Sequence, residues 1–455
     1  MAQTWNHSTR PDTLNTKADG YLDIWYMNQP SDDEYVYKYS GGYGTYCAKH
    51  QPFAVYRAEA EKTFFCYGGR PREKNQLLHM VSYFDHSTGV VPRPTVLIDK
   101  QTTDAHDNPV ISLDEAGHIW IFSSSHGTGR PSFIHRSRNP YDIDEFEWIR
   151  TTNFSYPQVW SMPGKGFFVL HTVYNMIGKG RALCSMQSLD GQKWTEPKAH
   201  AMIEMGHYQV SAALSEKAGT AFNMHPSPKG LNWRTNLYYM ETKDFGQSWQ
   251  TVGGGDLRTP LRDSMNPTLV HDYLSEGMKV YMKDLVFDED GYPIILYLTS
   301  KGYESGPKND PRTWHTARWT GTKWEIRTAM QSDSNYDMGS LYVEGDRWRL
   351  IAPTKAGPQK YNPGGEIEMW ISENQGERWD VSRQLTHNSK RNHTYVRRPL
   401  SAHDDFYALW ADGNPRELSE STLYFTDKEG EQVRVLPKIM KEDYVQPQVL
   451  DASIT

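Results

Sequence analysis

Two histidines stand at the two ends of one short hairpin in this sequence. His106 precedes an apolar stretch at 110–113, and His126 follows a second apolar stretch at 119–122. The turn between these stretches predicts an antiparallel pair of strands, which brings both imidazoles to the same end of a small sheet. Because imidazole exchanges a proton near neutral pH, this end of the hairpin is a candidate site for acid–base chemistry.

Two later hairpins carry a similar pairing of histidine and tyrosine. Tyr156 begins one strand, and His171 and Tyr174 end the strand that follows it. Tyr208 and His225 hold the same places in the next hairpin. A single histidine or tyrosine of this kind is more often structural, but three pairs at one rim favour a binding or catalytic site.

The hairpin pattern repeats along most of the chain, and the repeat predicts the fold. The expected first strands of the repeats begin at His50, His106, Tyr156, Tyr208, Lys283, Tyr336 and Arg397. Short strands in groups of four at such a period are typical of a β-propeller. We therefore predict an all-β, seven-bladed β-propeller with four antiparallel strands per blade at 46–437, after an N-terminal segment at 1–45 and before a C-terminal tail at 438–455.

A second repeat supports the propeller. Three segments share the form Ser/Thr-x-Asp/Asn-x-Gly-x-x-Trp, the first being one residue shorter, at 188–194, 242–249 and 372–379. This form resembles the Asp-box of sialidase-type propellers. The acidic or amide side chain caps a turn, glycine takes a positive φ, and tryptophan packs on the sheet. We interpret these boxes as structural.

The bulk composition excludes several classes of partner. The chain has 455 residues and a net charge of −7, so a basic nucleic-acid footprint is not expected. No apolar run approaches the roughly 18 residues that span a bilayer, so no membrane association is predicted. The N-terminus shows no signal-peptide pattern. No cofactor is required by any motif, although the many loop Asp and His residues are compatible with a structural Ca²⁺ or Zn²⁺.

The residue types at the rim suit one reaction better than another. Glycoside hydrolysis generally uses two Asp or Glu side chains that flank the bond. β-Elimination beside a uronic acid instead needs a cation to neutralise the substrate carboxylate, a base to remove the C5 proton and an acid for the leaving oxygen. Histidine and tyrosine supply base and acid, and arginine is the best clamp for a carboxylate.

Several motifs then carry a resemblance to a known family. The segments at 50–56, 104–111 and 120–128, together with 130–132, resemble the BNR-repeat propeller group that contains ulvan lyases, rhamnosyl-glucuronate lyases and rhamnosidase-like enzymes. The resemblance implies a lyase centre of two histidines, a tyrosine and an arginine. His106 and His126 match the histidines, and Tyr156 matches the tyrosine, with Tyr208 as the alternative.

The family arginine has no clean counterpart in this chain. Val173 and Met224 occupy the positions where the neighbouring hairpins would carry it, and Arg181, Arg234 or Arg397 are the candidate substitutes. His50 matches a position of rhamnosidase-like members.

The leading hypothesis is a polysaccharide lyase that acts on an acidic glycan of rhamnose and glucuronate, in a secreted or periplasmic setting that the substrate class favours. The alternatives are a rhamnosidase-like hydrolase and a non-catalytic glycan-binding propeller. The candidate catalytic residues are His106, His126, Tyr156 and Tyr208; the candidate substrate-binding residues are His50, Asn108, His171, Tyr174, Arg181, His207, His225, Arg234 and Arg397.

Overall fold

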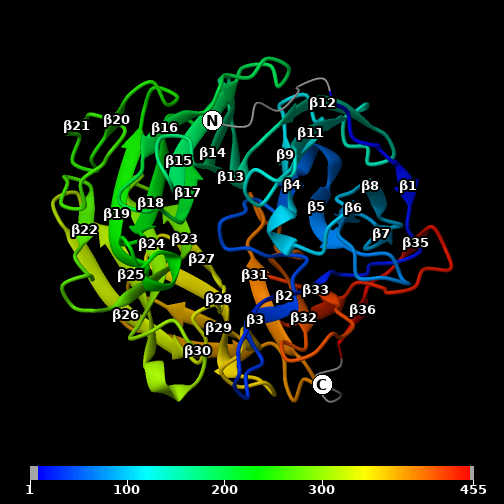
Figure 1. The fold of residues 1–455 in the computed structure, drawn as a ribbon. Helices are drawn as coiled ribbons and strands as arrows, with labels where there is room; N and C mark the ends of the chain where they lie inside the picture. The colour runs from blue at the N-terminus through cyan, green and yellow to red at the C-terminus, as the bar shows by residue number, and fades with distance from the viewer. Residues whose placement is uncertain (1–8, 451–455) are drawn as a thin grey trace.

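The regular structure of this chain consists almost entirely of strands. A computed structural model describes residues 9–450, and within them the helices are four short 3₁₀ turns, η1 (Ala58–Ala60), η2 (Ala105–Asp107), η3 (Leu231–Trp233) and η4 (Pro307–Asn309). Antiparallel sheets lie around a common centre, as Figure 1 shows. The all-β, propeller-like class is therefore confirmed.

The first four large sheets follow one another in chain order. The first contains β4 (Ala54–Arg57), β5 (Lys62–Gly69), β6 (Leu78–Asp85) and β8 (Thr95–Asp99), with β1 (Thr16–Lys17) at its edge. The second contains β9 (Pro109–Leu113), β10 (Ile119–Ser123), β11 (Ser132–Ser137) and β12 (Phe146–Thr152). The third contains β13 (Ser155–Met162), β14 (Gly166–Tyr174), β15 (Arg181–Ser188) and β16 (Lys198–Ala201). The fourth contains β17 (Gln209–Ala213), β18 (Ala218–Met224), β19 (Thr235–Thr242), β20 (Trp249–Gln250), β21 (Asp256–Leu257) and β22 (Leu269–His271).

The later sheets continue the same order. One contains β23 (Lys279–Phe287), β24 (Pro293–Ser300), β25 (Arg312–Trp319) and β26 (Trp324–Ser332). A larger one joins the run β27 (Ser340–Glu344), β28 (Arg347–Ala356), β29 (Gly365–Ser372) and β30 (Asp380–Gln384) to the run β31 (Asn392–Arg397), β32 (Ala408–Gly413), β33 (Leu423–Thr426), β34 (Val433–Val435) and β36 (Gln448–Val449). A single residue pair, Gly365 with His393, links the two runs. The division into seven blades stays a prediction, because the sheets found do not separate into seven.

Two predicted strand starts are wrong in position. Lys283 lies inside β23, where the register shifts between Met282 and Asp284, and Arg397 is the last residue of β31. A β-bulge lets an extended strand pass through a polar residue without ending, so a polar residue does not mark a boundary there. The starts at His106 and Tyr208 lie just before β9 and β17, as expected.

The Asp-boxes form the local turns that their residue types predict. In the first box, the Asp190 carboxylate accepts the backbone N–H groups of Gln192 and Lys193, each at 2.8 Å. The Trp194 indole donates to the Gly191 carbonyl at 2.7 Å, and Gly191 has a φ of +71°. A positive φ there is cheap only for glycine.

The N-terminal segment reaches the centre of the molecule. Its hairpin, β2 (Trp25–Pro30) with β3 (Tyr37–Gly42), continues into a loop at 43–50. The Asn108 amide donates to the carbonyls of Tyr43, Gly44 and Tyr46 at 2.7, 3.3 and 2.7 Å. These bonds fix the loop against the second sheet.

The C-terminal residues also return to the start of the chain, where β35 (Tyr444–Val445) pairs with β7 (Val91–Pro92). Within residues 9–450, no helix has the length and apolar character that a membrane crossing requires.

Candidate active site

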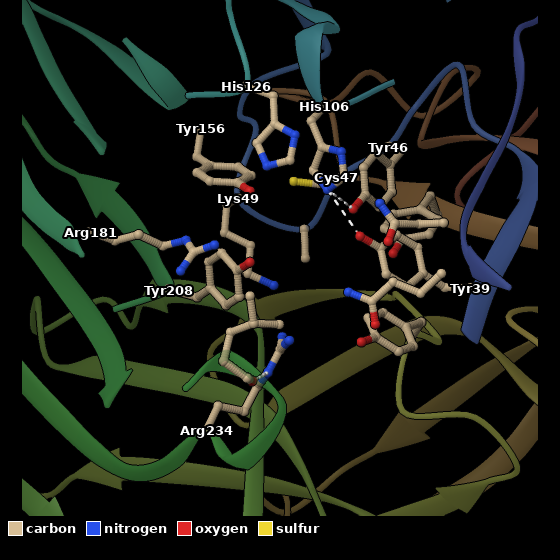
Figure 2. Close-up of a pocket in the computed structure, with 16 residues that line it drawn as sticks. Tyr39, Tyr46, Cys47, Lys49, His106, His126, Tyr156, Arg181, Tyr208 and Arg234 are labelled. Atoms are coloured by element: carbon tan, nitrogen blue, oxygen red, sulfur yellow. Dashed lines mark hydrogen bonds between the residues drawn. The ribbon is translucent and has the colours of Figure 1, made fainter. Parts of the chain in front are cut away.

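The predicted rim residues surround one pocket near the centre of the molecule (Figure 2). All four predicted catalytic residues line it, together with two of the three predicted arginines. The lining residues are Asn28, Gln29, Tyr39, Tyr46, Cys47, Ala48, Lys49, His106, His126, Tyr156, Arg181, Tyr208, Leu231, Arg234, Tyr336 and Tyr395. The pocket is therefore built by the N-terminal segment, by the second, third and fourth sheets, and by Tyr395 of the largest sheet and Tyr336 of the loop before it.

One carboxylate orients both histidines. Asp104 accepts from His106 Nδ1 at 2.6 Å through one oxygen and from His126 Nδ1 at 2.8 Å through the other. The two imidazole rings stack with centroids 4.0 Å apart. Burial alone would raise the pKa of the Asp104 carboxyl, but the charges and hydrogen bonds of the two histidines outweigh burial and hold that pKa well below its usual range. Asp104 is therefore an anion that positions the pair.

The two histidines differ in what they leave free. His106 is buried, and its Nε2 contacts the hydroxyls of Tyr46 at 2.7 Å and Tyr39 at 3.2 Å. Both of its ring nitrogens are thus occupied. His126 is 29% exposed, and within residues 9–450 no hydrogen bond to its Nε2 is found. His126 is therefore the histidine able to exchange a proton with a ligand, while burial lowers the pKa of His106.

Tyr156 enters the pocket through a distortion of its strand. It has a φ of +55°, and the register of β13 shifts between Ser155 and Gln158. A non-glycine residue in this region is uncommon and marks a local constraint. The Tyr156 hydroxyl accepts from Tyr174 at 3.3 Å, and burial raises its pKa well above the ordinary value. Tyr156 therefore keeps its proton and suits the role of a donor.

Tyr208 lies among three cations. The guanidinium of Arg234 is 4.7 Å from the Tyr208 ring centroid, the Lys49 ammonium is 4.9 Å away, and the Arg181 guanidinium is 5.6 Å away. Figure 2 shows these three side chains around the tyrosine ring. Cations at this distance are attracted to the face of an aromatic ring, so the positive charge of the pocket gathers around Tyr208.

Lys49 is a pocket residue that sequence reasoning missed. It lies on the loop at 43–50, next to the predicted strand start at His50. Burial lowers its pKa from 10.5 to about 7, with the charges of Arg234 and Arg397 acting in the same direction. Nothing in the repeat pattern marks this loop, because it belongs to a non-repeating segment that folds over the sheets.

The charge of the pocket is one-sided. Lys49, Arg181 and Arg234 line it, and among the lining residues, all within the described part of the chain, there is no Asp or Glu. Arg181 is held by its Nε, which donates to the Tyr174 hydroxyl at 3.3 Å, and Arg234 by its Nε, which donates to the Leu231 carbonyl at 2.8 Å. Three cations without a lining anion make a site for an anionic ligand.

The other predicted site residues do not line the pocket. Asn108 holds the loop at 43–50, as described above. Arg397 donates to the carbonyls of Thr45 and Cys47, so it holds the same loop.

Four further histidines of the predicted set are buried behind the pocket. His50 contacts the Ser124 hydroxyl at 2.9 Å. His207 Nδ1 donates to the Asn223 carbonyl at 2.8 Å, and its Nε2 accepts the Ile203 N–H at 3.0 Å. His225 packs against the Tyr208 ring at 4.8 Å. His171 lies 6.3 Å from the Phe154 ring, and burial lowers its pKa to about 4. Tyr174 reaches the site through Tyr156 and Arg181.

Asp104, His106 and His126 are also metal-type ligands, with one ligand atom of each within 4.8 Å of the others. Because Nδ1 of both histidines already faces the carboxylate, this group is equally well explained by the hydrogen bonds it makes. The expectation that catalysis needs no cofactor stays a prediction.

Fold and pocket together define a β-propeller-like scaffold with a cationic site near its centre. Residues 65–332, more than half of the chain, match the BNR repeat-containing family, and the chain belongs to that family. An ulvan lyase from Nonlabens ulvanivorans is 25% identical over 331 residues. That match covers 62% of this chain and 66% of the relative, so it spans just under two thirds of that protein.

Solved structures show the same fold. Two structures of an ulvan lyase of polysaccharide lyase family PL25, one of them bound to -[GlcA(1-4)Rha3S]-, superpose with a TM-score of 0.70 at 16% identity, covering 91% of this chain and 96% of theirs. The polysaccharide lyase Uly1 has a TM-score of 0.58 at 12% identity, covering 90% of this chain and 98% of its own.

Proposed function

We propose that this protein is a polysaccharide lyase that cleaves an acidic glycan beside a uronic acid by β-elimination. The observation that carries the proposal is the pocket composition: three cations, an imidazole with a free nitrogen and several tyrosines, Tyr156 and Tyr208 among them, with no carboxylate among the lining residues. A uronate needs its charge neutralised before its C5 proton becomes acidic, and this pocket offers the neutralising charge and the proton-transfer groups together.

Each group has a role that its surroundings favour. Arg181, Arg234 and Lys49 hold the substrate carboxylate. The base that takes the C5 proton is Tyr208, which these cations surround, or the free Nε2 of His126. The C5–H electrons then form the C4=C5 double bond while the C4–O bond breaks. The leaving oxygen takes a proton from the Tyr156 hydroxyl; the Tyr156 ring lies 5.5 Å from the Tyr208 ring.

The relatives support one substrate class for this proposal. Because the curated relative is an ulvan lyase and a structural neighbour holds a glucuronate–rhamnose unit, we propose a rhamnose- and glucuronate-containing glycan as substrate. The scaffold would be a seven-bladed propeller at 46–437, with the N-terminal segment completing the pocket. The successive four-strand runs from β4 to β34 support this division.

A hydrolase on the same scaffold is the second reading, and a glycan-binding propeller the third. Two-carboxylate hydrolysis finds no pair of acids in this pocket, since Asp104 lies behind the histidines and is held by them. A pure binder would not need a tyrosine among three cations.

One assay separates the three readings. The protein is incubated with ulvan and with a rhamnose-capped glucuronan, and ultraviolet absorbance and reducing ends are followed. A lyase gives an unsaturated product that absorbs, a hydrolase gives reducing ends alone, and a binder gives neither.

Variants then test the roles. Y208F and H126A should each lower kcat by about 10²–10⁴-fold, the usual worth of a proton-transfer group. Y444F, at a tyrosine that is 57% exposed on β35, is the matched control and should keep full activity. Full lyase activity in H106A, Y208F and H126A alike would refute the site.

A further inference from the structure

A second group of metal-type side chains lies away from the pocket, where the first and last runs of strands meet. His86 directly follows β6, and His403 and Asp405 lie in the loop between β31 and β32. One ligand atom of each residue lies within 4.8 Å of the others. None of these three residues lines the pocket, so the proposed lyase activity does not explain why they lie together.

His86 is oriented like a metal ligand. Its side chain is 5% exposed, and its Nε2 contacts the Thr63 hydroxyl at 2.8 Å. Its Nδ1 is buried and finds no hydrogen-bond partner in the described structure. When Nε2–H donates to Thr63, Nδ1 keeps its lone pair, and such a fixed tautomer is the usual support of a ligating histidine.

The other two residues face that lone pair. The Asp405 carboxylate oxygen Oδ2 is 3.9 Å from His86 Nδ1 and 3.7 Å from His403 Nδ1. The Tyr56 ring packs on both imidazoles, at 5.3 Å from His86 and 4.8 Å from His403. The nearby Arg434 donates to the Asp405 backbone carbonyl at 3.2 Å, which leaves the carboxylate available.

We propose that His86, His403 and Asp405 bind a zinc ion, with water as the fourth ligand. Two imidazoles and one carboxylate suit zinc, whereas calcium and magnesium prefer oxygen ligands alone. Ligands at zinc distances of about 2.0–2.1 Å stand about 3.4 Å apart in a tetrahedron, so the three side chains need to close only slightly.

The two more exposed residues of the group, His403 and Asp405, would make this movement. The two imidazole centroids are 3.8 Å apart, and His403 Nδ1 accepts the Asp405 backbone N–H at 3.1 Å. Zinc binding would reorient the His403 ring toward the ion and replace its bond to the Asp405 N–H. His403 and Asp405 are 30% and 54% exposed, so both side chains have room to move and the ion has access from solvent.

Such a site would cross-link the first sheet, which His86 follows, to the loop between β31 and β32. The first and last sheets already share aromatic contacts, with Phe65 and Phe406 rings 5.7 Å apart and Phe84 and Phe425 rings 5.1 Å apart. A metal that ties residues distant in the sequence constrains the unfolded chain and stabilises the folded one.

Zinc chloride titrated into the chelator-treated full-length protein tests the proposal. Calorimetry should show a zinc site that is lost in H403A and D405N. Zinc at 100 times its Kd should raise the Tm by about 2–3 °C, as linkage to folding requires. D404N changes the adjacent carboxylate on the same loop and is the matched control, which should bind zinc as the unchanged protein does.

The variants also separate this group from the histidines of the pocket. Zinc binding that survives both H403A and D405N but disappears in H126A would overturn the proposal, as would the absence of any zinc-dependent rise in Tm. Because Asp405 is largely exposed, D405N should fold normally, so loss of binding in that variant reports on ligation. Lyase activity is not part of this test, and its outcome is independent of the proposed function.

Discussion

At the scale of single residues, the structure gives different roles to two histidines that the sequence could not tell apart. His106 and His126 have the same chemistry in the sequence and share one carboxylate in the structure. The tyrosines of the N-terminal segment occupy the remaining nitrogen of His106, so that His126 faces the pocket. A histidine with both nitrogens bonded positions its neighbours, whereas one with a free nitrogen can exchange protons.

Lys49 gives the binding of substrate a pH dependence. Its pKa of about 7 means that the ammonium loses its proton just above neutral pH. We expect the affinity for a uronate oligosaccharide to fall as pH rises through this range. K49R should remove that fall, because arginine stays charged, and K49M should bind weakly at every pH. The measurement is the Kd for the oligosaccharide at a series of pH values. If K49R loses affinity with rising pH as the unchanged protein does, Lys49 is not the cause of the pH dependence.

Protein stability provides a second readout of the same lysine. The folded-state pKa lies below the unfolded value of about 10.4, so the unfolded chain binds the extra proton between these two pH values. Stability contributed by this group therefore rises with pH across that window. K49M removes a buried ammonium, so it should raise the Tm. This gain should be largest below about pH 7 and should disappear as the pH approaches the unfolded-state pKa of the lysine.

At the scale of elements, the N-terminal loop is as much a part of the site as the strands are. Asn108 donates to three carbonyls of this loop, and Arg397 donates to the Thr45 carbonyl of the same loop. The loop in turn places Tyr46 and Lys49 in the pocket. A residue outside the pocket thus controls the placement of residues inside it.

N108A should therefore lower both stability and substrate affinity. Three carbonyls lose their donor, which costs about 1–3 kcal/mol in a buried setting. N108D should cost more, because a carboxylate would face the same carbonyls. The free energy of unfolding and KM are the measurements. N139A, at an exposed asparagine, should change stability by less than about 0.5 kcal/mol. Equal effects of N108A and N139A would show that the loop is held by other contacts.

At the scale of the whole molecule, large aromatic side chains join neighbouring sheets. Trp249 of the second Asp-box is 2% exposed and packs on His200, with centroids 4.7 Å apart, and on Phe168 of the third sheet at 6.4 Å. Trp194 of the first box similarly meets Phe122 of the second sheet at 5.6 Å. The boxes therefore stabilise the arrangement of sheets around the centre.

W249A should destabilise the whole fold without altering the chemistry. Removing a buried tryptophan typically costs about 3–5 kcal/mol, because the cavity is only partly refilled. Thermal unfolding should show a clear fall in Tm, while kcat of the folded protein at low temperature stays the same. L189A, at a leucine that is 79% exposed in the first box, is the control and should leave Tm unchanged. A large loss of kcat in W249A would place this side of the molecule in the site.

The sequence by itself determined the class of fold and the pocket residues that belong to the repeated hairpins. Alternating apolar strands and turn residues specify each hairpin locally, so the rim positions of His106, His126, Tyr156 and Tyr208 follow from the repeat. The same repeat could not show that Lys283 and Arg397 lie within strands, since a bulge leaves no clear mark in residue types.

Only the tertiary structure decided which charges meet at the pocket. Arg181 and Arg234 come from different sheets, and Lys49 comes from a loop outside the repeat. Their convergence depends on how the sheets pack around the centre and on where the N-terminal segment crosses it. Such long-range placement has no local pattern in the sequence, because it is set by side-chain packing between segments that are distant along the chain.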